Sequence, residues 1–114
     1  MWNEPSISDL VKLPPIGSTE EVTGLDKLIG MHFFLHGSDW YAAEYDVADR
    51  EFFGYAILNS DLHNSEWGYF SFDELRDLKV KGIEVDRDLY WETRKASEVP
   101  KIVAAYGLIK RHKA

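Results

Sequence analysis

The middle of the chain alternates apolar and polar side chains with a period of two residues. Residues 28–36, 39–47, 52–58 and 67–72 follow this pattern or are apolar on both faces. Such alternation is typical of β-strands, whose successive side chains point to opposite faces. The short connections between these segments predict antiparallel hairpins, since a parallel crossover needs about a dozen residues. Gly54, within the most apolar segment, indicates the close approach of a neighbouring strand.

Helix signals flank the predicted strands. Ser71 and Glu74 have the spacing of a capping box, which predicts a short helix after the fourth strand. Ser97 is the predicted N-cap of a C-terminal helix that extends to about Lys110. A short helix near the N-terminus is expected to end before Pro14, because proline disfavours helix in the residue before it.

These elements predict an α+β fold in which residues 1–114 form a single domain. We expect an antiparallel sheet of four to five strands, with a further strand within residues 85–92. Two to three helices are expected to pack on one face of this sheet. A chain of 114 residues is long enough to bury one hydrophobic core of ordinary size.

Composition excludes several classes of protein. The chain has no cysteine, which excludes disulfide scaffolds, thiolate metal sites and cysteine nucleophiles. No apolar run approaches the roughly 20 residues of a membrane-spanning helix. The first ten residues carry acidic groups before any basic one, so they lack the cationic start of a signal peptide. We therefore expect a cytoplasmic protein with no membrane partner.

Negative charge is concentrated in the middle of the chain. The formal net charge is −7, and residues 31–79 hold ten acidic residues against three basic ones. Direct binding of nucleic acid needs cations opposite the phosphates, so we expect no nucleic-acid partner. The basic cluster at residues 110–113 is interpreted as a solvated chain end.

Several of these acidic residues are expected to form an acidic face that binds a partner, with two tryptophans as anchors. The predicted contact residues are Trp40, Glu44, Asp46, Asp49, Glu51, Asp61, Glu66 and Trp67. Glu44 and Asp46 would lie on one face of a strand, about 7 Å apart. Buried aromatic side chains at the centre of an interface often dominate its binding energy. A solvated acidic face with no partner is the alternative.

Histidines near carboxylates raise the alternative of a divalent metal site. His63 with Asp61, or His36 with Asp39, offers imidazole and oxygen ligands at short spacing. His32 and His36 have the i, i+4 spacing of a helical metal-binding pair. On a strand that spacing is about 13 Å, which is too long for one ion. Apart from such a metal, we expect no cofactor.

No catalytic signature is visible in the sequence. It contains no phosphate-binding glycine loop, no GxSxG motif and no HExxH motif. No lysine, histidine or glycine loop near the central carboxylates completes a nuclease or phosphoryl-transfer site. We therefore expect a binding protein that is not an enzyme.

Four segments in a fixed order resemble a known family. They are DWYAAEYD (39–46), FFGY (52–55), EWGYFSFDEL (66–75) and VDRDLYW (85–91). In this order they are similar to the domain-of-unknown-function family 2958, over residues 10–92. The stretch from Ser97 has no counterpart in this resemblance. The resemblance implies no activity and no catalytic residues, but it implies an origin in plasmids, conjugative elements and phages, often among anti-restriction genes.

The first functional hypothesis combines this implied setting with the charge pattern. It is a small acidic phage or mobile-element protein that inhibits a bacterial defence nuclease by protein–protein binding. The partner would be a CRISPR effector or restriction enzyme, or its nucleic-acid-binding subunit. One alternative is a metal-binding protein with a structural or catalytic His/Asp site. Another is a scaffold subunit of a mobile-element complex, which predicts exposed apolar surface.

Overall fold

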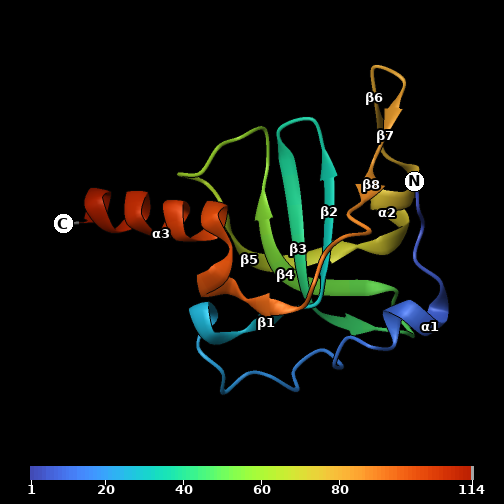
Figure 1. The fold of residues 1–114 in the computed structure, drawn as a ribbon, viewed down its shortest axis with the longest axis horizontal. Coiled ribbons are helices and arrows are strands. Elements are labelled where there is room, and N and C mark those ends of the chain that lie inside the picture. The colour runs from blue at the N-terminus through green and yellow to red at the C-terminus, as the bar shows by residue number, and fades with distance from the viewer. Residues whose placement is uncertain (114) are drawn as a thin grey trace.

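The protein folds around a five-stranded antiparallel sheet (Figure 1). This computed structural model describes the backbone of residues 1–113 and the side chains of residues 1–109, so the basic cluster at 110–113 lies outside the described side chains. The helices, with η for 3-10 helices, are α1 (Ile7–Leu10), η1 (Gly24–Asp26), α2 (Phe72–Asp77), η2 (Ala96–Glu98) and α3 (Pro100–Lys113). The strands are β1 (Leu28–Ile29), β2 (Met31–Leu35), β3 (Ser38–Asp46), β4 (Glu51–Ile57), β5 (Glu66–Ser71), β6 (Lys79–Val80), β7 (Ile83–Glu84), β8 (Asp86–Arg87) and β9 (Arg94–Lys95).

The main sheet confirms the predicted α+β class and the predicted hairpins. Its strand order is β5-β4-β3-β2-β8, and each neighbouring pair is antiparallel. A β-bulge between Ala42 and Glu44 shifts the register of β3 against β4. The first predicted strand divides at Gly30 into β1 and β2, and the strand expected within residues 85–92 is reduced to the two residues of β8.

Helices cover both faces of the sheet, so the prediction of helices on one face is wrong. On one face, a core that contains Phe33 and Phe52 packs against α1 and α2. On the other face, a core that contains Tyr55 and Ile102 packs against η2 and α3 (Figure 1). The central strand β3 is therefore buried at eight of its nine positions.

Local capping chemistry explains where the helices begin. The hydroxyl of Ser71 accepts a hydrogen bond from the backbone N–H of Glu74 at 3.2 Å, which confirms the predicted N-cap of α2. The C-terminal helix begins at Pro100 and not after Ser97, because η2 occupies the preceding residues. Proline suits the first helical position, where its missing N–H costs no hydrogen bond.

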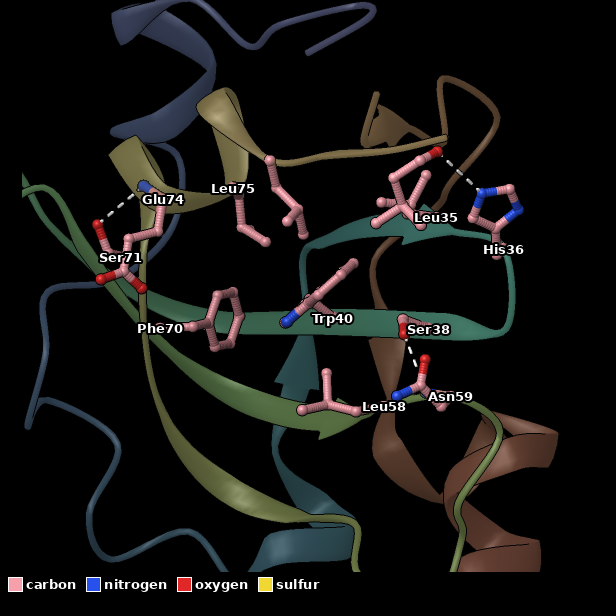
Figure 2. Close-up of a pocket in the computed structure, with 12 residues that line it drawn as sticks. Leu35, His36, Ser38, Trp40, Leu58, Asn59, Phe70, Ser71, Glu74 and Leu75 are labelled. Carbon is pink, nitrogen blue, oxygen red and sulfur yellow. Dashed lines mark hydrogen bonds between the residues drawn. The ribbon is translucent and has the colours of Figure 1, made fainter. Parts of the chain in front are cut away.

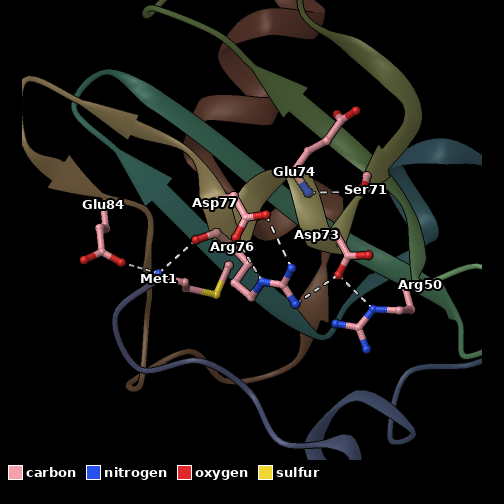
Figure 3. Close-up of polar contacts among 8 residues, drawn as sticks. All are labelled: Met1, Arg50, Ser71, Asp73, Glu74, Arg76, Asp77 and Glu84. Atoms are coloured by element: carbon pink, nitrogen blue, oxygen red, sulfur yellow. Dashed lines mark hydrogen bonds and ion pairs between the residues drawn. The ribbon is translucent and has the colours of Figure 1, made fainter.

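The N-terminus is fixed against the end of α2. The amino group of Met1 donates to the carbonyl of Arg76 at 3.0 Å and also pairs with Glu84 of β7 (Figure 3). The hairpin of β6 and β7 projects from the body of the protein beside this contact (Figure 1). Within the part of the chain that the structure describes, no helix is long and apolar enough to cross a bilayer.

Candidate partner-binding surface

Three carboxylates gather at the turn between β3 and β4. Asp46 ends β3, Asp49 is exposed in the turn, and Glu51 begins β4 opposite Asp46. The Asp46 carboxylate accepts a hydrogen bond from the backbone N–H of Asp49 at 3.1 Å. Side-chain interaction with the Asp46 carboxyl and the repulsion of its charge raise the pKa of the Asp49 carboxyl. We call Asp46, Asp49 and Glu51 the acidic turn.

Arg50, which lies within the turn, and Arg76 of α2 are bound by other carboxylates. Arg50 Nε lies 2.8 Å from Asp73, and Arg76 lies 3.2 Å from Asp73 and 3.1 Å from Asp77 (Figure 3). The hydrogen bond from Arg76 lowers the pKa of the Asp77 carboxyl. Among the described side chains, no ion pair includes a member of the acidic turn. Its carboxylates are therefore available to the cations of a partner.

Glu44 does not belong to an outer acidic face, so that prediction is wrong. Glu44 is 3% exposed. Its carboxylate accepts hydrogen bonds from the backbone N–H groups of Gly17 (2.9 Å) and Thr19 (3.0 Å) and from the Thr19 hydroxyl. The ammonium of Lys27 donates to the carbonyl of Thr19 at 2.6 Å. The 14–27 segment thus crosses the face of β3 that the sequence pattern predicted to be exposed to solvent. Glu44 anchors that segment to β3.

Replacing Glu44 with glutamine is expected to lower the free energy of unfolding by about 2 kcal/mol, since an amide nitrogen cannot accept the bonds that one carboxylate oxygen accepts. Urea denaturation followed by tryptophan fluorescence measures this loss. Glu66→Gln is the matched control, because Glu66 is exposed and a surface change of this kind costs less than about 0.5 kcal/mol. Equal stability of the two variants would contradict the anchoring role of Glu44.

The remaining predicted carboxylates lie at the opposite end of β4. Glu66 begins β5 opposite Ala56, Asp61 lies in the β4–β5 loop, and both are exposed. Asp61 accepts hydrogen bonds from the side-chain amide (2.7 Å) and the backbone N–H (3.3 Å) of Asn64, and these bonds lower the pKa of the Asp61 carboxyl. The predicted single face is therefore corrected to the acidic turn and a separate acidic pair, and the binding roles of both stay predictions.

Neither predicted tryptophan is an exposed anchor, because both rings lie against covered faces of the sheet. Trp40 is 7% exposed. Trp67 is half-buried, its ring lies edge-on to Tyr55 at 5.3 Å, and its indole N–H donates to the hydroxyl of Tyr106 at 2.8 Å. The exposed ring on β5 is instead Tyr69, at 63%.

An apolar groove runs between α2 and the sheet (Figure 2). Its cavity volume is about 390 Å³. Apolar side chains form most of its wall and polar ones its rim: Leu35, Trp40, Leu58, Phe70, Leu75, Leu78 and Val80, with His36, Ser38, Asn59, Ser71 and Glu74. The hydroxyl of Ser38 accepts from the backbone N–H of Asn59 at 2.9 Å, and the His36 ring donates to the carbonyl of Val80 at 3.4 Å. A groove of this kind can receive apolar side chains of a partner.

A cluster of charged side chains that the sequence pattern did not predict joins β2, β3 and α3. The His32 ring lies 2.8 Å from Asp39 and 3.3 Å from Asp88, and Lys101 lies 2.7 Å from Asp39. The imidazole stacks on Tyr41 at 4.5 Å. Burial raises the pKa of Asp39, but hydrogen bonds from His32 and Lys101 outweigh burial and lower it. Burial, followed by the Asp39 charge, raises the pKa of Tyr41 well above its usual range.

This cluster has the geometry of a structural anchor. The raised pKa of Tyr41 means that its hydroxyl does not readily give up its proton. The His32 side chain is 13% exposed and lies between the carboxylates of Asp39 and Asp88. The contacts fix two strands to α3 and to the chain after β8. No local spacing signals them, since Asp39 and Lys101 are separated by 62 positions.

One of the two predicted metal pairs, His36 with Asp39, is not brought together. His36 lines the groove, whereas Asp39 points to the opposite face of the sheet and binds His32. His32 and His36 therefore also lie on different faces. Among the described side chains, no three of His, Asp and Glu are grouped as metal ligands would be. Metal binding by Asp61 and His63, which share the β4–β5 loop, stays a prediction.

Comparisons with known proteins identify a family and assign no activity. No curated protein and no solved structure matches the chain. The family described as protein of unknown function (DUF2958) matches residues 19–109. The match begins at Thr19 and extends into α3, so the bounds of the resemblance, residues 10–92, are corrected to residues 19–109. Because the match covers most of the chain and every strand of the main sheet, the protein belongs to the DUF2958 family.

Proposed function

We propose that this protein inhibits a bacterial defence nuclease by binding its cationic, nucleic-acid-binding surface. The target would be a CRISPR effector or a restriction enzyme in the cytoplasm of a bacterial host. The acidic turn is the observation that carries the proposal. Its carboxylates lie within six residues, and no ion pair with a described Lys or Arg neutralises them. This role requires no catalysis, no cofactor and no direct contact with nucleic acid.

Electrostatics explains how an acidic turn can serve an inhibitor. A nucleic-acid groove carries Arg and Lys side chains placed to meet phosphates, and carboxylates can occupy the same positions. Complementary charge speeds the encounter and fixes the orientation of the partners more than it adds affinity. Side-chain hydrogen bonding with the Asp46 carboxyl, followed by the repulsion of its charge, raises the pKa of Asp49, and a bound cation would relieve that repulsion. The mobile-element setting that the family resemblance implies is consistent with such a target.

Burial of apolar side chains in the groove supplies binding affinity that the charges of the acidic turn alone do not supply. Glu74 on the groove rim belongs to α2 (Figure 2). This helix begins beside the acidic turn, because the N–H of Phe72 donates to the carbonyl of Arg50 at 2.9 Å. Leu58, at one side of the groove, is 53% exposed. Burial of apolar area contributes about 25 cal/mol per Å². An interface across both features would combine charged recognition with apolar burial.

The test is a plasmid-protection assay in bacteria with an active CRISPR system or restriction enzyme. Expression of the protein is expected to raise transformation by a targeted plasmid. The variant with Asp46→Asn, Asp49→Asn and Glu51→Gln is expected to bind the target at least about tenfold more weakly at low salt, because it removes the charges that steer the encounter. Affinity of the purified proteins at two salt concentrations measures this effect.

The matched control removes charge at the other end of β4. Asp61→Asn with Glu66→Gln also lowers the net negative charge but leaves the acidic turn intact. This control is expected to protect the plasmid as the wild type does. Equal loss in both variants would show that only net charge matters. Lack of protection against a panel of CRISPR effectors and restriction enzymes would refute the inhibitor proposal.

Exposed apolar side chains favour one second candidate, a scaffold subunit of a mobile-element complex. Leu78, Val80 and Ile83 are each more than one-third exposed, and they lie close to the groove and the β6–β7 hairpin. Apolar patches rimmed by polar residues often mark protein–protein contacts. Light scattering of the purified protein distinguishes the candidates, since only the scaffold requires assembly in the absence of a defence nuclease.

A further inference from the structure

The two edges of the main sheet are covered differently. At the β8 edge, the N–H of Trp2 donates to the carbonyl of Val85 at 2.9 Å, and the N–H of Arg87 donates to the carbonyl of Trp2 at 3.2 Å. At the other edge, β5 pairs with β4 and with no other strand of the described chain. Every position of β5 is exposed or half-buried. β5 therefore presents an open edge of six residues.

The register decides which backbone groups of β5 point outward. The N–H of Phe72 donates to the carbonyl of Arg50 at 2.9 Å, which marks these residues as a hydrogen-bonded pair of the antiparallel ladder. Bonded and non-bonded pairs alternate along such a ladder, so Trp67 and Tyr69 occupy non-bonded positions against β4. Their N–H and C=O groups consequently point toward the open edge.

A hollow lies on each face of the sheet beside this edge. On the α2 face, the apolar groove reaches β5 at Phe70 (Figure 2). On the other face, a hollow of about 270 Å³ is lined by Phe53 and Tyr69 from the strands and by Glu20 and Lys27 from the 14–27 segment. Alternate side chains of a strand point to opposite faces, so a strand added to β5 would direct its side chains into both hollows.

Carboxylates border the open edge on both faces. Glu74 lies on the groove rim, while Glu20 lines the second hollow and Glu51 faces the last residue of β5. None of the three forms an ion pair with a described Lys or Arg. Lys27, the cation of the second hollow, is hydrogen-bonded within its own segment. The charge at this edge therefore suits a basic segment.

We propose that the open edge of β5 binds an extended segment of a partner by strand addition, and that this segment alternates apolar with basic residues. The inference rests on the proposed function and names the part of the partner that is bound. The outward groups of Trp67 and Tyr69 hydrogen-bond the added backbone. Its apolar side chains enter the groove, and its Lys or Arg side chains meet Glu20 and Glu51.

The first test uses a synthetic peptide of about ten residues that alternates valine and lysine. In NMR titrations of the full chain, the peptide is expected to slow amide hydrogen exchange at Trp67 and Tyr69 at least about tenfold. A valine–glutamate peptide is expected to bind at least about tenfold more weakly. The valine–lysine peptide methylated at every amide is expected not to bind. Equal binding of the methylated peptide, or unchanged exchange at β5, would overturn the proposal.

The second test changes one outward backbone group. Tyr69→Pro removes the outward N–H but no bond to β4, because proline is tolerated on edge strands at such positions. This variant is expected to bind the valine–lysine peptide at least about tenfold more weakly, whereas Tyr69→Ala keeps the N–H and is expected to lose less than about threefold. Equal losses would show that the ring is bound and not the backbone. If Tyr69→Pro does not fold, binding of the methylated peptide to the wild type tests whether backbone hydrogen bonds hold the added segment.

The plasmid-protection assay separates this inference from the proposed function. Peptide binding at β5 without plasmid protection would support the edge site and refute the inhibitor. Protection that survives Tyr69→Pro, with no peptide binding, would refute the edge site and support the inhibitor. Loss of protection in Tyr69→Pro but not in Tyr69→Ala would support both.

Discussion

Replacing Gly54 with alanine is expected to destabilise the fold strongly. Gly54 lies in β4, where the bulge between Ala42 and Glu44 brings the backbone of β3 close. A Cβ at this position would lie 2.0 Å from the carbonyl oxygen of Tyr41. Both atoms belong to the backbones of central strands, so no side-chain rotation relieves the clash. Overpacking usually costs about 1–3 kcal/mol, and we expect a loss of about 3 kcal/mol or more here.

The register provides a matched control for this substitution. Gly68 of β5 lies directly opposite Gly54, but a Cβ at Gly68 would meet no atom within 4 Å. Gly68→Ala is therefore expected to change the free energy of unfolding by less than about 0.5 kcal/mol. Urea denaturation of both variants, followed by tryptophan fluorescence, measures the difference. Equal midpoints would contradict the close contact of β3 and β4 at the bulge.

The strands could be predicted because alternation and turn residues are local signals. Residues 39–47, 52–58 and 67–72 each begin and end within one residue of β3, β4 and β5. The contact of Gly54 with the neighbouring strand also followed from its place in an apolar run. Alternation does not say what covers each face. β3 is buried on both faces because α3 packs on one of them, and the residue spacing within β3 does not indicate this packing.

The candidate surface could be predicted only where its residues are close in sequence. The acidic turn joins carboxylates within six residues of one hairpin, so the charge pattern located it. Asp61 and Glu66 follow β4, whose seven residues carry the chain roughly 20 Å to the other end of the sheet. Glu44 alternates correctly with its neighbours, but its hydrogen-bond partners come from a segment 25 to 27 residues earlier. Local patterns therefore predicted that the protein is acidic. They did not predict that its exposed carboxylates form two separate groups.

Replacing Asp39 with asparagine is expected to lower the free energy of unfolding by about 2–3 kcal/mol at neutral pH. The Asp39 side chain is 5% exposed and accepts from His32 at 2.8 Å and from Lys101 at 2.7 Å. An asparagine would turn its NH₂ group toward one of these donors and leave that donor without an acceptor. Thermal unfolding is expected to show a Tm lower by about 10 °C. A Tm close to that of the exposed control Glu66→Gln would contradict the anchoring role of the cluster.

The pKa of Asp39 gives this prediction a pH dependence with a definite sign. The pKa of Asp39 in the folded protein lies below its ordinary value of 3.8, so the unfolded chain takes up the proton first as the pH falls. The stability that the carboxylate contributes is therefore present above pH 3.8 and is lost as the pH falls through the lower folded-state pKa. The stability difference between wild type and Asp39→Asn is expected to shrink in that acidic range, and urea denaturation at a series of pH values measures it.

Lys101 provides the control for this pH dependence, because its hydrogen bond and charge are among the causes that lower the pKa of Asp39. In Lys101→Met, burial opposes ionisation of Asp39 and only His32 favours it. The pKa of Asp39 should then rise toward its unfolded value, so acid should remove less stability from this variant than from the wild type. An equal loss in the two proteins would mean that the contact of Lys101 with Asp39 contributes nothing to folding, although its Nζ lies 2.7 Å from the carboxylate. A smaller loss would attribute part of the acid sensitivity of the sheet to the contact that fixes α3 to β3.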